Sequence, residues 1–198
     1  YKSFRAHEGR ISDLAVVPGK NEFISTGTDG RILRWTPGDN EQTYKVLYSG
    51  SEIFGVLAVS PGADWLACGG QNAGIRMIPI NGNDSPGYDL KGHSEEIKSL
   101  IFSYDGKYLY SGALDGKVLK WDLAARTSVD MSTGQMKITS IDVSSDNKYI
   151  AGIGNEGKAL VWNPDVRSDN FSIGSEGKAI KTIKFKPAMQ NGYPRRCN

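Results

Sequence analysis

The segment "SGALDGKVLKWD" at Ser111–Asp122 has a near-copy, "STGTDGRILRWT", at Ser25–Thr36. Each copy has a run with small residues, an Asp-Gly pair and a second run that ends near a tryptophan, and the two tryptophans, Trp35 and Trp121, are 86 positions apart. Asp-Gly between two strand-forming runs is a strong signal for a β-hairpin. One hairpin written twice at this distance indicates a repeat architecture.

An apolar pattern with steps of three and then two residues marks the first strand of each repeat. It begins at Ile11, Phe54, Ile97, Ile138 and Ile180, so successive copies are 43, 43, 41 and 42 residues apart. Each of the first four copies continues with a turn, a second run, a turn, a third run and a weaker fourth run such as "TYKVLY" or "GYDLKG". Turn signals every 8–12 residues without a helical period predict an all-β chain. A four-stranded sheet of this size cannot bury both faces alone, and radial stacking of such sheets gives a β-propeller.

These repeats resemble the WD-repeat family of β-propellers. Gly92-His93 and Trp121-Asp122 match the family's Gly-His and Trp-Asp pairs, and Ala6-His7 and Trp35-Thr36 match them in part. The resemblance implies blades of four antiparallel strands, each locked by a hydrogen-bonded chain of four side chains. These would be His7, Ser25 (or Thr26), Asp29 and Trp35 in the first repeat and His93, Ser111, Asp115 and Trp121 in the third.

The second and fourth repeats depart from the family pattern. Gly50 and Gly134 stand where histidine is expected, and Ile78 replaces the tryptophan of the second repeat. We expect these two blades to rely on packing alone.

The repeats also suggest how the chain is divided. They cover 7–48, 50–91, 93–132 and 134–173, with a partial fifth from 176, in one propeller domain or fragment over 1–198. Propellers have about 4–8 blades and about seven are usual in the WD-repeat family. About four full blades therefore suggest an incomplete propeller, whose remaining blades come from missing sequence or from another chain.

Composition narrows the partners and the compartment. The formal net charge is only +2, which does not favour nucleic acid or an anionic membrane surface. We find neither a signal peptide nor an apolar run of the roughly 18 residues that a membrane helix needs. The two cysteines, Cys68 and Cys197, form no disulfide framework, so we expect a reducing, cytoplasmic location. No nucleic-acid or membrane partner is expected.

No motif indicates catalysis. The two histidines lack the spacing of a zinc site, and "GIGNEGK" at 152–158 imitates a phosphate loop but lies between two predicted strands and is followed by Ala159. The aspartates fall mostly at turns, where they serve local hydrogen bonding. We therefore predict a protein that is not an enzyme and that has no metal or cofactor.

The leading hypothesis is a non-catalytic scaffold that binds a protein or peptide. The alternatives are a sensor or scaffold segment of a larger multidomain signalling protein and, third, a propeller-based hydrolase. In the WD-repeat family, partner contacts often lie just after the histidine position and just before the turn aspartate. The corresponding candidates are Glu8, Arg10, Thr28, Ser51, Ile53, Gln71, Ser94, Glu96, Leu114, Gln135, Lys137 and Asn155. Ile53 and Leu114 could supply an apolar anchor for a partner, or could instead cover the mouth of a central channel.

Overall fold

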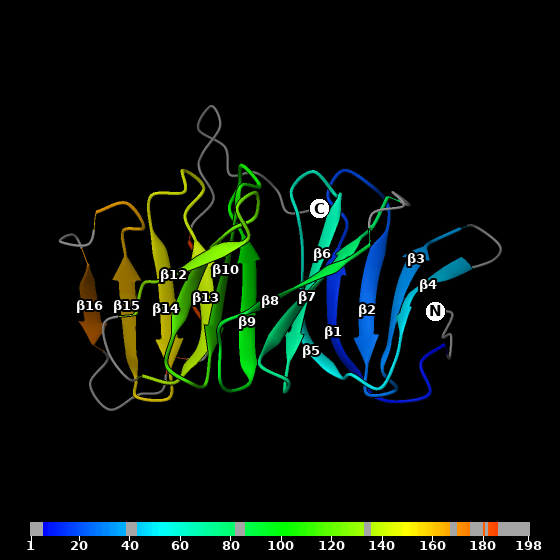
Figure 1. The fold of residues 1–198 in the computed structure, drawn as a ribbon, viewed down its shortest axis with the longest axis horizontal. Helices are drawn as coiled ribbons and strands as arrows, with labels where there is room; N and C mark the ends of the chain where they lie inside the picture. Colours follow the sequence, from blue (N-terminus) through cyan, green and yellow to red (C-terminus); the bar gives the residue numbers. More distant parts are fainter. Residues whose placement is uncertain are drawn as a thin grey trace. The chain divides into compact units, whose positions relative to one another are not determined.

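The computed structural model describes residues 6–38, 43–81, 86–132, 136–166, 170–174, 180 and 182–185. These residues contain sixteen β-strands and no helix (Figure 1). The strands form four antiparallel sheets of four strands each, and each sheet contains four strands that are consecutive in the sequence. The all-β prediction is therefore confirmed. In the described part of the chain, no helix is long and apolar enough to cross a membrane.

The chain divides into two compact units, Tyr1–Leu100 and Ile101–Asn198. The first sheet, in the first unit, contains β1 (Ile11–Val16), β2 (Phe23–Gly27), β3 (Arg31–Thr36) and β4 (Thr43–Ser49). The second sheet, in the same unit, contains β5 (Phe54–Val59), β6 (Trp65–Gly70), β7 (Gly74–Pro79) and β8 (Tyr88–Lys91). Adjacent strands in both sheets pair in sequence order.

The third sheet contains β9 (Ile97–Phe102), β10 (Tyr108–Ala113), β11 (Val118–Asp122) and β12 (Thr127–Asp130). The fourth contains β13 (Ile138–Val143), β14 (Ile150–Gly154), β15 (Lys158–Trp162) and β16 (Phe171–Gly174). Of the predicted fifth repeat, the structure describes only residues 180 and 182–185, which are not in a strand. The amide of Phe185 donates a hydrogen bond of 2.6 Å to Oδ2 of Asp142 in β13. Whether the sheets form one domain stays a prediction.

A β-bulge explains the apolar step of three residues at the start of the first, second and fourth repeats. Ile11 pairs with Gly27 and Asp13 with Thr26, which leaves Ser12 as an extra residue on β1. The same register shift occurs at the start of β5 and of β13. A bulge adds one residue to one strand of a pair. The residues before and after it therefore share a face of the sheet although they are three positions apart.

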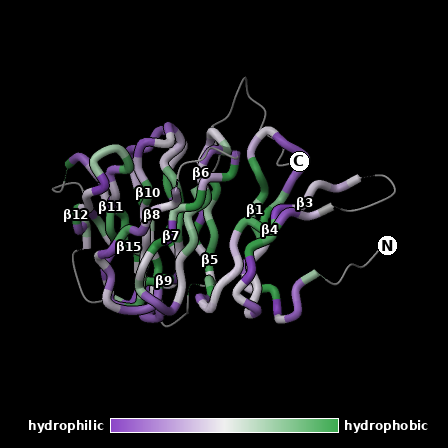
Figure 2. Tube along the Cα trace, turned by 45° about the vertical axis from the view of Figure 1, so that its right-hand side comes forward, coloured by the Kyte–Doolittle hydropathy of each residue, from purple (hydrophilic) through white to green (hydrophobic). Residues whose placement is uncertain are grey.

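Each unit has an apolar core between its two sheets. In the first unit β1 and β2 pack against β5, and Ile24 and Ile32 of the first sheet cluster with Phe54 and Leu66 of the second. In the second unit β10 packs against β13. Figure 2 shows hydrophobic residues along the strands and hydrophilic ones at many of the turns. Fully burying one such side chain contributes about 1.5–3 kcal/mol, so contact between neighbouring sheets stabilises each blade.

The turn between β6 and β7 contains a strained backbone site. The turn before the third strand needs a positive φ, and glycine supplies it in three repeats, at Gly30, Gly116 and Gly157. Ala73 occupies this position in the second repeat with φ of 56°. A left-handed conformation costs a non-glycine residue roughly 1–2 kcal/mol. The second repeat thus departs from the other three in this turn, and it shares the missing histidine with the fourth.

Candidate functional site

Four side chains of the first repeat form one hydrogen-bonded chain. Nε1 of Trp35 donates to Oγ of Ser25 at 2.8 Å, and that oxygen lies 2.8 Å from Nε2 of His7. Nδ1 of His7 lies 3.0 Å from both carboxylate oxygens of Asp29. An indole N–H can only donate, so the serine hydroxyl accepts from Trp35. The ionised carboxylate of Asp29 can only accept, so Nδ1 of His7 carries the proton and donates to it; with a neutral imidazole, Nε2 then accepts from the Ser25 hydroxyl.

The third repeat contains the same pairing of indole and hydroxyl. Nε1 of Trp121 donates to Oγ of Ser111 at 2.8 Å, and the amide of Lys117 donates to Oδ1 of Asp115 at 3.0 Å. Ser111 and Trp121 are buried. His93, the remaining member predicted for this repeat, is partly buried.

The fourth repeat keeps the tryptophan but lacks the hydroxyl. Gly152 stands at the position of Ser25 and Ser111, and the ring of Trp162 lies against it. Nε1 of Trp162 is buried and finds no hydrogen-bond partner among the described residues. An unpaired buried donor costs about 1–3 kcal/mol, so this tryptophan stabilises its blade through packing alone.

Asp29 also holds the loop that contains His7. Its carboxylate accepts hydrogen bonds from the amide of Glu8 at 2.9 Å and from that of Arg31 at 3.2 Å. Burial raises the pKa of Asp29, but the hydrogen bonds from His7, Glu8 and Arg31 outweigh burial and leave this pKa below its ordinary value of 3.8. The carboxylate thus fixes both the loop and the turn as long as it is ionised.

The first loop and the first turn bring three of the partner-binding candidates together. The amide of Arg10 donates to Oγ1 of Thr28 at 3.0 Å, and the amide of Thr28 donates to the carbonyl of Arg10 at 2.9 Å. Glu8, Arg10 and Thr28 are all exposed. The amide of Gly50, in the loop of the second repeat, donates to the carbonyl of Gly30 at 3.1 Å. The two loops of this unit are therefore joined through one turn.

The other candidates differ in exposure. Ser51, Ile53, Gln71, Ser94, Lys137 and Asn155 are exposed, whereas Glu96 and Leu114 are partly buried. Glu96 pairs with Lys98 at 2.9 Å. The carbonyls of Ile53 and Lys137 lie against Gly70 and Gly154, so loop and second strand approach closely in these repeats too. Gln135 lies outside the described residues.

The sequence did not reveal the polar contacts between neighbouring sheets. Oδ2 of Asp13 accepts from the amide of Leu57 at 2.8 Å and so joins β1 to β5. The guanidinium of Arg34 donates to Oε2 of Glu22 at 2.6 Å and, at 2.8 Å, to the carbonyl of Ile80, which directly follows β7 of the next sheet. The sequence contained a hint of the Arg34 contacts, because Arg34 and Lys120 are cations at the same repeat position. Their partners lie outside the repeat pattern and could not be read from it.

Metal-binding side chains do not gather in the described part of the chain, and its one free cysteine is not exposed. Within 6–38, 43–81, 86–132, 136–166 and the short segments after them, no three His, Cys, Asp or Glu side chains are grouped so that they could hold a metal ion. Cys68 is fully buried, and burial raises the pKa of its thiol well above the usual range. A thiol that stays protonated is a poor nucleophile.

Comparison with known proteins finds the same repeat elsewhere. Residues 1–36 and 84–122 match the family described as "WD domain, G-beta repeat". Protein groucho of Drosophila melanogaster is 27% identical over 161 residues, which cover 81% of this chain and 22% of that protein. The guanine nucleotide-binding protein subunit beta-1 of Nicotiana tabacum is 26% identical over 199 residues, which cover 92% of this chain and 52% of that protein.

Solved structures show the same fold. The RRP9 WD40 repeats superpose with a TM-score of 0.75 at 21% identity, over 86% of this chain and 52% of theirs. U3-55K superposes with a TM-score of 0.76 at 21% identity, over 86% of this chain and 53% of its own. These likenesses confirm the propeller class predicted from the repeats. The chain spans about half the length of the tobacco relative and of both structures, and about a fifth of groucho.

Replacing tryptophan by phenylalanine should cost more in the first repeat than in the fourth. Trp35→Phe removes the donor to the Ser25 hydroxyl, whereas Trp162→Phe removes an N–H that has no partner among the described residues. We expect Trp35→Phe to lower the free energy of unfolding by about 1–2 kcal/mol more than Trp162→Phe, as measured by urea denaturation. Trp121→Phe serves as a second paired case and should resemble Trp35→Phe. Equal losses at positions 35 and 162 would contradict this account of the indole donors.

Acid should abolish the contribution of Asp29. The folded-state pKa of Asp29 is lowered, so its stabilisation is fully present above the unfolded-state value, near 3.8, and is lost as the pH falls through the folded-state pKa. Asp29→Asn should therefore be less stable than the parent at pH 6, and the difference should shrink below about pH 3.8. Urea denaturation of both proteins between pH 6 and pH 3 measures this. Val46→Ala, which truncates an exposed apolar side chain and changes no charged group, should keep a constant difference from the parent.

Proposed function

We propose that this chain, whose β-propeller blades resemble WD repeats, is a non-catalytic module that binds a protein or peptide partner. The proposed contact surface consists of the loop before the first strand of each blade and the turn between its second and third strands. One observation carries the proposal. At Glu8, Arg10 and Thr28 the side chains are exposed, while hydrogen bonds hold the backbone of the same residues in place. Loops that a rigid scaffold positions are common binding sites.

An apolar side chain on this surface supports the proposal. Ile53 is 39% exposed beside the polar candidates Ser51 and Gln71. Apolar anchors within a polar rim are typical of protein interfaces. The tobacco relative is by name a subunit of a guanine nucleotide-binding protein, that is, part of an assembly. This is a further reason to propose a protein partner here.

We also propose that the chain has no catalytic activity of its own and acts in the cytoplasm. Ser25, His7 and Asp29 place a hydroxyl beside an imidazole and a carboxylate, but Ser25 is only 1% exposed and its oxygen also accepts from Trp35, so a substrate does not reach it. The buried thiol of Cys68 favours a reducing compartment. The two other hypotheses, a segment of a larger signalling protein and a propeller-based hydrolase, stay predictions.

We further propose that another blade, from other sequence or from a second chain, covers the outer face of β1. The first-strand positions of the first repeat, Ile11, Leu14 and Val16, are 53%, 53% and 67% exposed. The equivalent positions of the fourth repeat, Ile138, Ile141 and Val143, are 1%, 2% and 1% exposed. A neighbouring sheet packs on β13 through β10, so a sheet of the same kind would suit β1. Apolar patches of this sort mark interaction sites.

Light scattering on a size-exclusion column tests the covering blade. We expect the 198-residue chain alone, of 21.6 kDa, to associate, and Leu14→Glu to shift it toward a monomer by placing a charge on the exposed face. Val129→Glu, on a strand of the second unit where Val129 is equally exposed, is the matched control and should not change the mass. A monodisperse monomer of the parent chain would contradict this part of the proposal.

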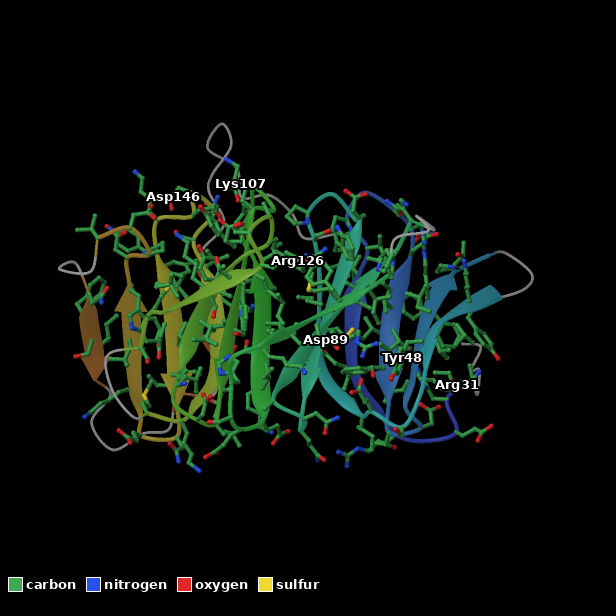
Figure 3. All side chains as sticks on the ribbon, in the orientation of Figure 1. Arg31, Tyr48, Asp89, Lys107, Arg126 and Asp146 are labelled. Atoms are coloured by element: carbon green, nitrogen blue, oxygen red, sulfur yellow. The ribbon has the colours of Figure 1, made fainter. Side chains whose placement is uncertain are left out.

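Site-specific photo-crosslinking tests the contact surface. A photoreactive residue at Thr28, Ile53 or Asn155 should give adducts with a discrete partner in cell extract. The same residue at Lys107 or Lys148 should not, because these positions lie in the turns at the opposite strand ends. Lys107 and Asp146 mark these turns in the second unit (Figure 3). We expect Ile53→Asp to weaken binding of the identified partner at least about tenfold. Equal adduct yields at both strand ends would count against the proposed surface.

A further inference from the structure

A cavity lies beside the turn between β6 and β7, on the surface proposed for partner binding. Its volume is about 190 Å³, and its lining includes Glu52, Ile53, Asn72, Gly74, Arg76, Asp89 and Lys91. At about 30 Å³ per water molecule, this volume corresponds to about six waters. The cavity therefore has room for one side chain of a partner.

The first repeat shows why the second has a cavity here. The chain positions 43 residues before Gly50 and Gly74 are His7 and Arg31. In the first repeat His7 packs over Gly27, and Nη1 of Arg31 reaches the carbonyl of Ala6 at 3.1 Å. In the second repeat both large side chains are replaced by glycine. The ring of Tyr48 fills the space beside Gly50, whereas a Cβ added at Gly74 would meet only one atom within 4 Å, at 3.9 Å. The second blade thus leaves open the space that Arg31 fills in the first.

Charged groups form one wall of this cavity. Arg76 stands at the repeat position that Leu33, Leu119 and Leu160 occupy in the other blades. Its Nε lies 2.6 Å from Oδ1 of Asp89, and its Nη2 lies 4.0 Å from Oε2 of Glu52.

An aromatic ring also contacts Arg76. The guanidinium carbon lies 5.8 Å from the centroid of the Tyr48 ring, within the range of a cation–π contact. Tyr48 comes from β4 and Asp89 from β8, and both are labelled in Figure 3. Two carboxylates and one ring therefore hold the guanidinium in place, with its charge at the cavity wall.

The groups that still lack partners are hydrogen-bond donors. Both lining carboxylates already face Arg76, and Glu52 also accepts from the Tyr48 hydroxyl at 3.3 Å. In the part of the chain that the structure describes, by contrast, neither the Lys91 ammonium nor the Asn72 amide has a hydrogen-bond partner. An ammonium and an amide N–H₂ beside a guanidinium are suited to an anion.

We propose that this cavity binds the carboxylate of an aspartate or glutamate side chain of the partner. The carboxylate contacts Lys91 and Asn72 near the wall formed by Arg76, and the aliphatic part of the side chain lies against Ile53. The inference rests on the proposed function, since Ile53 belongs to the same contact surface. The inference specifies which kind of partner side chain the second blade binds.

Titration with a small capped amino acid tests the cavity without knowledge of the partner. N-acetyl-glutamate N-methylamide is added to the isotope-labelled 198-residue chain, and backbone amide shifts are followed by NMR. We expect saturable shifts at Gly70–Arg76 and Lys91, with a Kd on the order of 1 mM for a single side chain. The corresponding glutamine and lysine compounds should bind at least about tenfold more weakly. Equal shifts with all three compounds, or no saturable shift with glutamate, would overturn the proposal.

Two variants locate the binding. Gly74→Arg restores the residue found in the first repeat and fills the cavity, and it should abolish the shifts, since the open space at Gly74 lets the variant fold. Lys91→Gln should weaken binding about tenfold. Lys117→Arg, at the position of Gly74 in the third repeat, is the control and should leave the shifts unchanged. Undiminished binding to a folded Gly74→Arg protein would overturn the assignment.

The outcome is separable from that of the proposed function. If the crosslinks at Thr28, Ile53 and Asn155 form but the glutamate compound does not bind, the contact surface stands and the cavity assignment fails. If the compound binds but no partner crosslinks, the cavity assignment stands and the proposed contact surface fails.

Discussion

A four-stranded sheet of short strands has two apolar faces and no means of burying both, and the rest of the structure depends on this constraint. In each unit the solution is contact between successive sheets, with β1 and β2 against β5 and with β10 against β13. For this contact, the first strand of each sheet carries large residues and the second strand carries small ones. The exposed face of β1 shows what happens where no described sheet provides the contact.

Polar groups buried by this stacking impose a second requirement. A tryptophan that closes the third strand brings an indole N–H into the core, and the first repeat satisfies it through Ser25, His7 and Asp29. The same chain fixes the loop before β1, because Asp29 also accepts from the loop's backbone. Stability and the shape of the candidate contact surface therefore depend on one set of hydrogen bonds. The repeats that lack the set differ in both respects, as Trp162 and the cavity at Gly74 show.

The fold was accessible from the sequence because local signals and the repeat agreed. The Asp-Gly turns, the apolar steps and the tryptophan positions each predicted strands at the same places, and the strands formed there. The spacing of His7, Ser25, Asp29 and Trp35 was readable only through the resemblance to a family. The cluster around Arg76 was not readable, because it depends on the cross-strand pairing of Arg76 with Asp89 and on Tyr48 from a neighbouring sheet. Such contacts depend on three-dimensional register, which no repeat pattern encodes.

The bulge at the start of β1, β5 and β13 affects more than which residues share a face of the sheet. Each of these strands lies at an edge of its sheet, with one row of backbone N–H and C=O groups unpaired within that sheet. A regular row of this kind is a template on which a strand of another molecule can add, and this is a route to aggregation. An extra residue at Ser12 interrupts the spacing of the row and increases its local twist. The irregularity that sets the apolar step of three thus also makes these edges poor templates for foreign strands.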